Sequence, residues 1–316
     1  MKKGEIKTTR LFTKNIDNTK TFNQLVDEFL KVVKVLGRSE FTIKSYSYHA
    51  KYFIQFIGDD FLCKNINKQL FEDYIKYMQK EKHITNGVTL NSYIRNITPI
   101  VKYGYKQKYI LEDFKMPIVL EQETFKEIYT PEELNLLLEK PKKNDFVSIR
   151  TWSIIWVLAS TGIRSRELRE LKIGNVDFTN RIIAVNNTKN KKARYIPISE
   201  SLGLVLNEYL SIRGGEGDNY LFCTVFDEIL SPTCLSKSIT KYCNSRGVEK
   251  SSIHLFRHTF ITNAVNKNVN PLILKKITGH STLKELNKYY NAKTTDIVEV
   301  IDDIAPKGKR KHQFKK

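Results

Sequence analysis

The sequence predicts a mainly α-helical protein of two domains with one small β-hairpin. Its 316 residues are enough for roughly two separate cores. Apolar residues recur at the helical period along most of the chain, and short β-branched segments replace that period only near residues 181–199. The stretch 112–128, which contains Pro117, fits neither period, and we therefore expect it to link the two domains.

The first domain is expected to be a bundle of four helices over residues 21–111, preceded by a flexible basic arm at 1–20. Thr21 and Gln24 form the pair of a capping box at the start of the first helix, and the second helix follows Ser39. The helical patterns cover residues 22–36, 41–58, 70–81 and 90–108.

The second domain, 129–305, begins with a helix whose N-cap is Thr130, with Pro131 in the first turn and Glu133 completing a capping box. Helices are then expected near 151–160 and 165–173, a hairpin from the segments 181–187 and 193–199, and a late helix between Asn270 and Gly279. The basic tail, 306–316, is expected to be disordered.

The charge of the chain indicates a polyanionic partner. Lys and Arg total 53 against 34 Asp and Glu, so the net charge is +19 and the pI about 9.6. Nucleic acid is the usual partner of such a chain. An anionic membrane is the alternative, but no apolar run approaches the roughly 18 residues of a spanning helix. The first residues lack the apolar stretch of a signal peptide, so we expect a cytoplasmic protein associated with the nucleoid.

Cationic side chains and one tyrosine form a candidate site for cutting DNA. To catalyse phosphoryl transfer, a protein must mainly position the reacting groups and stabilise charge, and cationic side chains do this as well as magnesium does. We therefore expect no metal and no cofactor. The candidate residues, in chain order, are Arg164, Lys189, His254, Arg257, His280 and Tyr289.

Arg164 lies where an apolar helix breaks at Gly162 and a polar helix begins. Its planar guanidinium can hold two phosphate oxygens at once. Glu167, one turn later, can orient the arginine from behind, although a surface salt bridge between the two residues explains the same spacing.

Lys189 lies at the tip of the predicted hairpin, where a long cation can reach into a groove and give a proton to a leaving oxygen. The alternative is a solvated basic turn that contacts the DNA backbone. We expect that backbone contact from the neighbouring side chains Lys191, Lys192 and Arg194.

His254 and Arg257 are spaced to lie on one helix face, and a histidine can accept a proton from a nucleophile near neutral pH. A histidine buried in the core is the alternative. His258 is adjacent to Arg257, about 100° around the helix, and is interpreted as structural. His280, directly after Gly279, can donate to a phosphate oxygen.

Tyr289 follows His280 by nine residues on a short helix that begins at Ser281. Core packing explains any single tyrosine equally well. The neighbouring Tyr290 competes for the role of nucleophile, and spacing alone does not choose between them.

Taken together, these motifs resemble the tyrosine recombinase (phage integrase) family over roughly residues 20–305. The segment TGIRSRELRELKIGNVD resembles its first arginine box, TKNKKARYIPIS its lysine hairpin, and HLFRHTFITNAVNKNVNPLILKKITGHSTL its second box. Thr278 stands where the family commonly has an apolar residue. The resemblance implies a helical SAM-like core-binding domain followed by a mixed α/β catalytic domain, in the compact Xer-like or transposon-integrase layout.

The resemblance also implies a mechanism. Tyr289 attacks a DNA phosphate and forms a 3′-phosphotyrosyl link, while Lys189 protonates the 5′-hydroxyl and His254 assists removal of the tyrosine proton. Arg164, Arg257 and His280 hold the non-bridging oxygens, with Glu167 supporting them. The family spaces its tyrosine nine residues from the final histidine, which favours Tyr289.

The implied partner is a double-stranded recombination site, contacted in the first domain by Lys44, Tyr48 and Lys51. The family acts as a homo-tetramer, or with a related recombinase, and the segment 296–305 carries an apolar helical stripe that fits such a contact or packing on its own domain. A type IB topoisomerase-like enzyme and a catalytically inactive sequence-specific DNA-binding protein are the alternatives. A metal-dependent nuclease would need clustered carboxylates, which the motifs lack.

Overall fold

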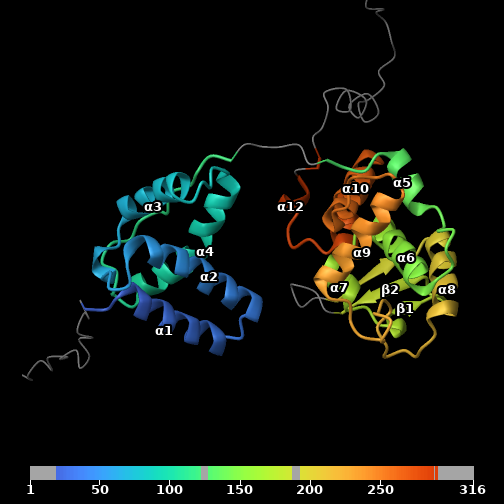
Figure 1. Cartoon of the computed structure of the whole chain (residues 1–316), viewed down its shortest axis with the longest axis horizontal. Helices are drawn as coiled ribbons and strands as arrows, with labels where there is room; N and C mark the ends of the chain where they lie inside the picture. Colours follow the sequence, from blue (N-terminus) through green and yellow to red (C-terminus); the bar gives the residue numbers. More distant parts are fainter. Residues whose placement is uncertain (1–18, 122–126, 187–192, 288, 291–316) are drawn as a thin grey trace, which may run out of the picture. The chain divides into compact units, whose positions relative to one another are not determined.

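The computed structural model describes residues 19–121, 127–186, 193–287 and 289–290 (Figure 1). The chain divides into two compact units, Met1–Thr124 and Phe125–Lys316. Helices make up most of the described residues, and one sheet of three strands lies in the second unit. The predicted fold class is therefore confirmed. Within the described ranges, no helix combines the length and apolar character needed to cross a membrane.

The first unit is built from four helices, as the sequence predicted. They are α1 (Phe22–Val35), α2 (Glu40–Ile57), α3 (Lys68–Lys80) and α4 (Gly87–Lys106), with a 3₁₀ turn at Cys63–Asn65. Each begins with a side chain that accepts a backbone hydrogen bond, and the predicted capping box of Thr21 and Gln24 is present. Aromatic rings dominate the core; Phe53, for example, stacks on Phe71 with ring centroids 4.8 Å apart.

The first part of the predicted linker belongs to this unit instead. Phe114, Met116 and Val119 pack against its core. The buried Asn91 of α4 donates to the Val119 carbonyl at 2.8 Å and accepts from the Val119 N–H at 2.9 Å. The segment forms neither helix nor strand, so its sequence shows no period. The side-chain amide of Asn91 nevertheless pairs with the backbone of Val119, and the apolar side chains of the segment pack against the core.

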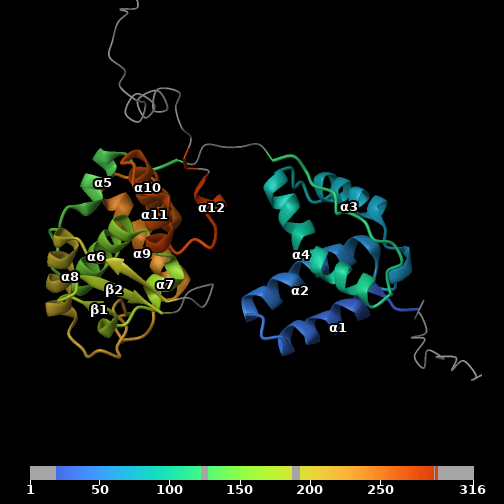
Figure 2. The ribbon, with the colours of Figure 1, turned by 180° about the vertical axis from the view of Figure 1, so that it is seen from behind.

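The second unit places its longest buried helix at the centre (Figure 2). Helix α6 (Phe146–Thr161) is predominantly apolar and is buried around most of its circumference, which is typical of a core helix. It contacts α5 (Pro131–Leu138), α8 (Glu200–Arg213), α9 (Pro232–Ser245) and α10 (Ile253–Asn266). The predicted capping box at Thr130 opens α5.

The sheet contains the predicted hairpin, β2 (Ile182–Val185) and β3 (Arg194–Pro197), paired antiparallel with Ile183 opposite Ile196. A third strand, β1 (Val176–Asp177), pairs with β2 and was not predicted. With two residues it is too short to show an alternating pattern in the sequence.

Three helices complete the candidate site: α7 (Ser165–Arg169), α11 (Pro271–Thr278) and α12 (Lys284–Asn287). Asn270 caps α11 and Gly279 ends it in the left-handed conformation, as predicted. Tyr289 lies just beyond α12 rather than on the expected helix. The Tyr289 N–H donates to the Leu286 carbonyl three residues earlier, so the chain turns more tightly there than an α-helix. The arm, the segment 296–305 and the tail 306–316 lie outside the described residues.

Candidate active site

Arg164 is placed by the break between α6 and α7. Gly162 ends α6 at φ 58°, and a Cβ there would lie 2.7 Å from the Phe260 ring, so both the turn and the space require glycine. Arg164 is then the N-cap of α7, and its N–H donates to Glu167 Oε2 at 3.1 Å. The guanidinium donates to the Gly279 carbonyl at 2.6 Å, which fixes its direction.

Glu167 is buried and joins two arginines. Its carboxylate accepts from Arg164 Nη1 at 3.1 Å and from Arg194 Nη1 and Nη2 at 3.0 and 2.8 Å. Burial raises the pKa of Glu167, but the hydrogen bonds and charge of Arg194, with those of Arg164, outweigh it and leave the pKa below the ordinary 4.5. The residue therefore remains ionised and holds both guanidinium groups in place.

Arg194 is largely buried, whereas the sequence led us to expect an exposed side chain that contacts DNA. Only 10% of it is exposed, and its Nε donates to the Ile277 carbonyl at 2.8 Å. The reason is the period of the strand. Arg194 shares a face of β3 with the buried Ile196, so the sheet turns the guanidinium towards Glu167 and α11.

Arg257 is buried on α10 and bridges the two ends of the site. It donates to the Gly162 carbonyl at 2.6 Å and to the Thr278 carbonyl at 2.8 Å, and its Nη2 lies 3.1 Å from His280 Nε2. Burial lowers the pKa of Arg257 to about 10, and repulsion from Arg164 adds to the effect. The Arg257 guanidinium thus stays charged at neutral pH, although burial and the neighbouring Arg164 disfavour its charged form.

Gly279 is required where α11 meets the arginines. Its φ is +66°, and a Cβ would lie 2.9 Å from Arg194 Nη1 and 3.0 Å from Arg164 Nη1. The close approach brings His280, the next residue, beside Arg257. The other ring nitrogen of His280, Nδ1, is 2.7 Å from Thr278 Oγ1. Thr278, the residue before Gly279 and His280, therefore makes a hydrogen-bond contact that an apolar side chain at this position could not make.

The two tyrosines have different partners. The Tyr289 hydroxyl is in hydrogen-bond contact with His258 Nδ1, and the ring centroids are 5.7 Å apart. The Tyr290 hydroxyl donates to the Val269 carbonyl at 2.9 Å. Burial raises the pKa of Tyr289, and the charge of Arg257 opposes that rise. Tyr289 is therefore the tyrosine within electrostatic reach of the arginine cluster.

His258, which we interpreted from the sequence as structural, has a contact that the sequence did not predict. It contacts the candidate nucleophile, whereas His254 is exposed in the first turn of α10. Relative to Arg257, His258 lies about 100° around the helix. His254 and His258 are one turn apart, about 40° around the helix, and so share a face. This i, i+4 pair was the signal that could have found His258.

The loop that joins β2 to β3 at 187–192 lies outside the described residues, and it carries the predicted Lys189, Lys191 and Lys192. The strands at its base are described. Arg194, two residues after Lys192, ties that base to Glu167.

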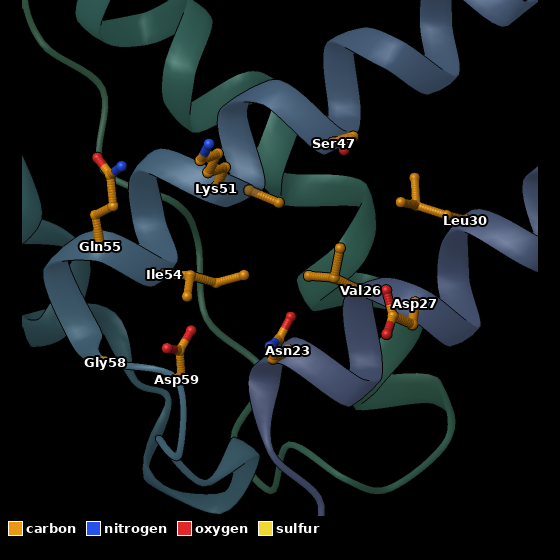
Figure 3. A pocket seen from close by; sticks show the side chains of 11 residues that line it. Asn23, Val26, Asp27, Leu30, Ser47, Lys51, Ile54, Gln55, Gly58 and Asp59 are labelled. Atoms are coloured by element: carbon orange, nitrogen blue, oxygen red, sulfur yellow. The ribbon is translucent and has the colours of Figure 1, made fainter.

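The predicted DNA contacts of the first unit, Lys44, Tyr48 and Lys51, are exposed on α2. A hollow of about 430 Å³ lies between α1 and α2 (Figure 3). Its charged lining consists of Asp27, Asp59 and Lys51, so the hollow is not an anion site, and none of the candidate catalytic residues lines it.

The site as a whole suits an anion with several oxygens. Three guanidinium groups, those of Arg164, Arg194 and Arg257, are held together against one carboxylate, that of Glu167. Their mutual repulsion is relieved when an anion such as a phosphate binds. A tyrosine hydroxyl close to that cluster is a nucleophile for the phosphorus.

The comparisons with known proteins agree with this chemistry. Residues 127–296 match the Phage integrase family, and residues 20–118 match the Phage integrase SAM-like domain. The chain belongs to the phage integrase family. Within it, the protein is a tyrosine-type site-specific recombinase, an enzyme of DNA recombination.

Relatives match nearly the whole chain. The tyrosine recombinase of Pseudothermotoga lettingae is 25% identical over 276 residues, covering 85% of this chain and 94% of that protein. Tyrosine recombinase XerA of Saccharolobus solfataricus is 25% identical over 288 residues, covering 89% and 90%.

Solved structures show the same fold. The Tn1549 transposon integrase in complex with transposon right end DNA has a TM-score of 0.75 at 21% identity, covering 91% of this chain and 100% of that one. The XerH recombinase bound to difH substrate has a TM-score of 0.63 at 21% identity, covering 89% and 84%.

Proposed function

We propose that this recombinase breaks and rejoins DNA strands through a 3′-phosphotyrosyl intermediate on Tyr289, without metal or ATP. The observation that carries the proposal is the convergence of Arg164, Arg257 and His280 around Gly279, with the Tyr289 hydroxyl in contact with His258, the residue that follows Arg257 on α10. Cations fixed before the reaction stabilise the charge that develops on the phosphate oxygens.

Arg164, Arg257 and His280 hold the non-bridging oxygens in this mechanism. Glu167 positions Arg164 from behind, and Arg194 shares that carboxylate. The Tyr289 oxygen bonds to phosphorus, the bond to the 5′ oxygen breaks, and Lys189 gives that oxygen a proton. His254 is assigned to the tyrosine proton by family resemblance alone. The covalent intermediate keeps the bond energy, so a 5′-hydroxyl from another strand can reverse the step.

The substrate is proposed to be a double-stranded recombination site. Two relatives of the same fold are described as bound to such DNA, a transposon end and a difH site. The net charge of +19 favours many phosphate contacts. Assembly of four copies through residues 296–305 is a further part of the proposal. Mass photometry on DNA that carries the recombination site tests this assembly. A protein that ends at residue 295 is expected to lose the tetramer.

The test of the mechanism is covalent capture on a nicked substrate from which the cleaved fragment diffuses away. The wild type is expected to form an adduct that survives a denaturing gel, and Tyr289→Phe is expected to abolish it while DNA binding persists. Tyr290→Phe is the matched control and retains the adduct, because its hydroxyl is bound to the Val269 carbonyl. Adduct from the Tyr289 variant, but not from the Tyr290 variant, would assign the nucleophile to Tyr290.

A further inference from the structure

We propose that Thr278 is a positioning residue of this site, and that its hydroxyl fixes both the ring and the tautomer of His280. The inference rests on the proposed function, because it takes His280 as a group that contacts the phosphate. Thr278 is fully buried at the end of α11, and its Oγ1 lies 2.7 Å from His280 Nδ1. An apolar side chain, which the family commonly has at this position, could not make this contact.

The C-terminal end of α11 is where the arginines of the site are anchored. The carbonyls of residues 277, 278 and 279 accept, in that order, from Arg194 at 2.8 Å, Arg257 at 2.8 Å and Arg164 at 2.6 Å. The last carbonyls of a helix lack partners within the helix and carry partial negative charge, so cations suit them. Thr278 is the middle residue of this run, and its backbone already holds one of the three guanidinium groups.

The hydrogen bonds of the Thr278 hydroxyl assign a proton to one nitrogen of His280. The hydroxyl has a single hydrogen, which it donates to the Leu274 carbonyl one turn earlier at 2.6 Å. It therefore presents a lone pair to His280 Nδ1. A nitrogen that bonds to this lone pair must be a donor, so Nδ1 carries a proton.

Arg257 gives the same assignment from the other side of the ring. One hydrogen of its Nη2 goes to the Thr278 carbonyl at 2.8 Å, and the second faces His280 Nε2 at 3.1 Å. A guanidinium can only donate, so Nε2 is the acceptor and carries no proton in the neutral ring. The opposite tautomer would set two N–H groups against each other. Arg257 cannot turn away, because its Nη1 also donates to the Gly162 carbonyl at 2.6 Å.

Thr278 therefore serves His280 in both of its protonation states. In the neutral ring only Nδ1 carries a proton, and in the imidazolium both nitrogens do, so the hydroxyl accepts from Nδ1 in each. Nε2 can donate to a phosphate oxygen only from the imidazolium, whose second proton comes from solvent. The ring keeps its direction while Nε2 changes from acceptor to donor, because its other edge stays bound.

The charges around His280 oppose and favour that second proton in turn. They belong to side chains of four elements, namely Arg257 on α10, Arg164 and Glu167 at α7, Arg194 on β3 and Glu285 on α12. The arginines oppose the proton and the carboxylates favour it. The hydrogen bond from Ser281 lowers the pKa of Glu285, and the charge of His280 adds to that effect. A bound phosphate adds negative charge, so we expect it to draw the proton onto Nε2.

The test detects the tautomer directly, by NMR of the DNA-free full chain labelled with ¹⁵N-histidine. The His280 signals are identified by their absence from His280→Gln. In the wild type, Nδ1 should appear as a protonated nitrogen at every pH, and acidification should change the signal of Nε2 alone. In Thr278→Val, which keeps the shape of the side chain but lacks the hydroxyl, the signals of both nitrogens should change, because both tautomers become populated.

The rate of adduct formation on saturating nicked substrate measures the functional effect. Thr278→Val is expected to slow adduct formation by about 10–100-fold, because the buried Nδ1–H of His280 is left without its acceptor. Its gel-shift affinity for DNA should change little. Thr278→Ser keeps the hydroxyl and should retain both the wild-type rate and the wild-type spectrum.

The proposal is overturned if the neutral ring of His280 in the wild type is protonated on Nε2, or if Thr278→Val keeps the wild-type rate or the wild-type spectrum. Equal losses of rate in the Val and Ser variants would also overturn it, because they would assign the effect to packing. The spectrum of the DNA-free protein does not depend on the reaction. Failure of the wild type to form any adduct would therefore refute the proposed function, while the spectrum still decides the role of Thr278.

Discussion

At the scale of single residues, the site depends on how closely its cations can approach one another. Gly279 is the clearest case, because both its backbone conformation and its surroundings exclude a side chain. The Gly279 carbonyl accepts from Arg164, and the next residue is His280. A change here therefore moves two candidate phosphate-binding groups together.

We predict that Gly279→Ala destabilises the second unit by about 1–3 kcal/mol through its left-handed backbone and also slows adduct formation by displacing the arginines. Gly247→Ala is the control, since its φ is +72° but nothing lies within 4 Å of an added Cβ. Gly247→Ala should lower the stability of the second unit without slowing adduct formation. Both tryptophans, Trp152 and Trp156, lie on α6, so urea unfolding followed by tryptophan fluorescence reports this unit. Equal adduct rates for the two variants would contradict the crowding argument.

Glu167→Gln is predicted to cost about 3–5 kcal/mol, because it leaves Arg194 buried without its charged partner. Glu170→Gln, at the C-cap of the same helix, removes a pair with the exposed Arg166 and should cost about 0–1 kcal/mol. The folded-state pKa of Glu167 lies below 4.5. Its stabilisation is therefore complete above that pH and is lost as the pH falls through the lowered pKa.

The same fluorescence titration, repeated from neutral pH downwards, checks the sign. The difference in unfolding free energy between the wild type and Glu167→Gln should shrink as the solution becomes acidic. A difference that grows on acidification would mean that Glu167 is protonated in the folded protein.

At the scale of secondary-structure elements, the hairpin of β2 and β3 connects the candidate general acid to the arginines. Arg194 begins β3 and binds both Glu167 and the Ile277 carbonyl. The loop that carries Lys189 thus starts from a base fixed to α7 and α11. The anchored strands are the reason to test Lys189 as the general acid.

Lys189→Ala is predicted to slow cleavage of a normal strand but to react at near the wild-type rate when the 5′-bridging oxygen is replaced by sulfur. A thiolate leaves without a proton, so the general acid becomes unnecessary. Adduct formation on the two substrates, compared in parallel, measures the effect. If both substrates show equal defects, Lys189 only binds DNA, and Lys191→Ala and Lys192→Ala should be measured next.

At the scale of the whole molecule, the net charge and the phosphate contacts of each unit should determine the affinity for DNA. The net charge of +19 belongs to the whole chain, and both units carry exposed lysines. If each unit contacts phosphates, affinity depends on both and falls with salt, because each contact releases condensed counterions.

For about 6–10 phosphate contacts, we predict that affinity for DNA falls about 10³–10⁵-fold between 50 and 200 mM salt. Residues 129–316 alone should bind more weakly and with a shallower slope, while still cleaving weakly at low salt. Gel-shift titrations of both proteins across a salt series measure the slopes. Identical slopes would assign the first unit to protein contacts rather than to DNA.

Much of the fold followed from local signals in the sequence. Thr21, Thr130 and Asn270 begin helices, and Gly162 and Gly279 end them, because a cap involves only neighbours along the chain. The set of candidate catalytic side chains was likewise readable as an ordered series of motifs. The linker was misjudged in part, since its extended segment is held by Asn91, a residue far back in the chain.

Tertiary structure alone decided which side chains meet. Arg194 binds a carbonyl 83 residues away, and His258 contacts a hydroxyl 31 residues away. Neither pairing leaves a local period, and the different partners of the adjacent Tyr289 and Tyr290 hydroxyls likewise depend on residues distant in the sequence. The sequence by itself determined the elements and the chemical groups, because caps and periods are short-range. The tertiary structure decided their pairing, because close packing brings distant residues together and directs each side chain.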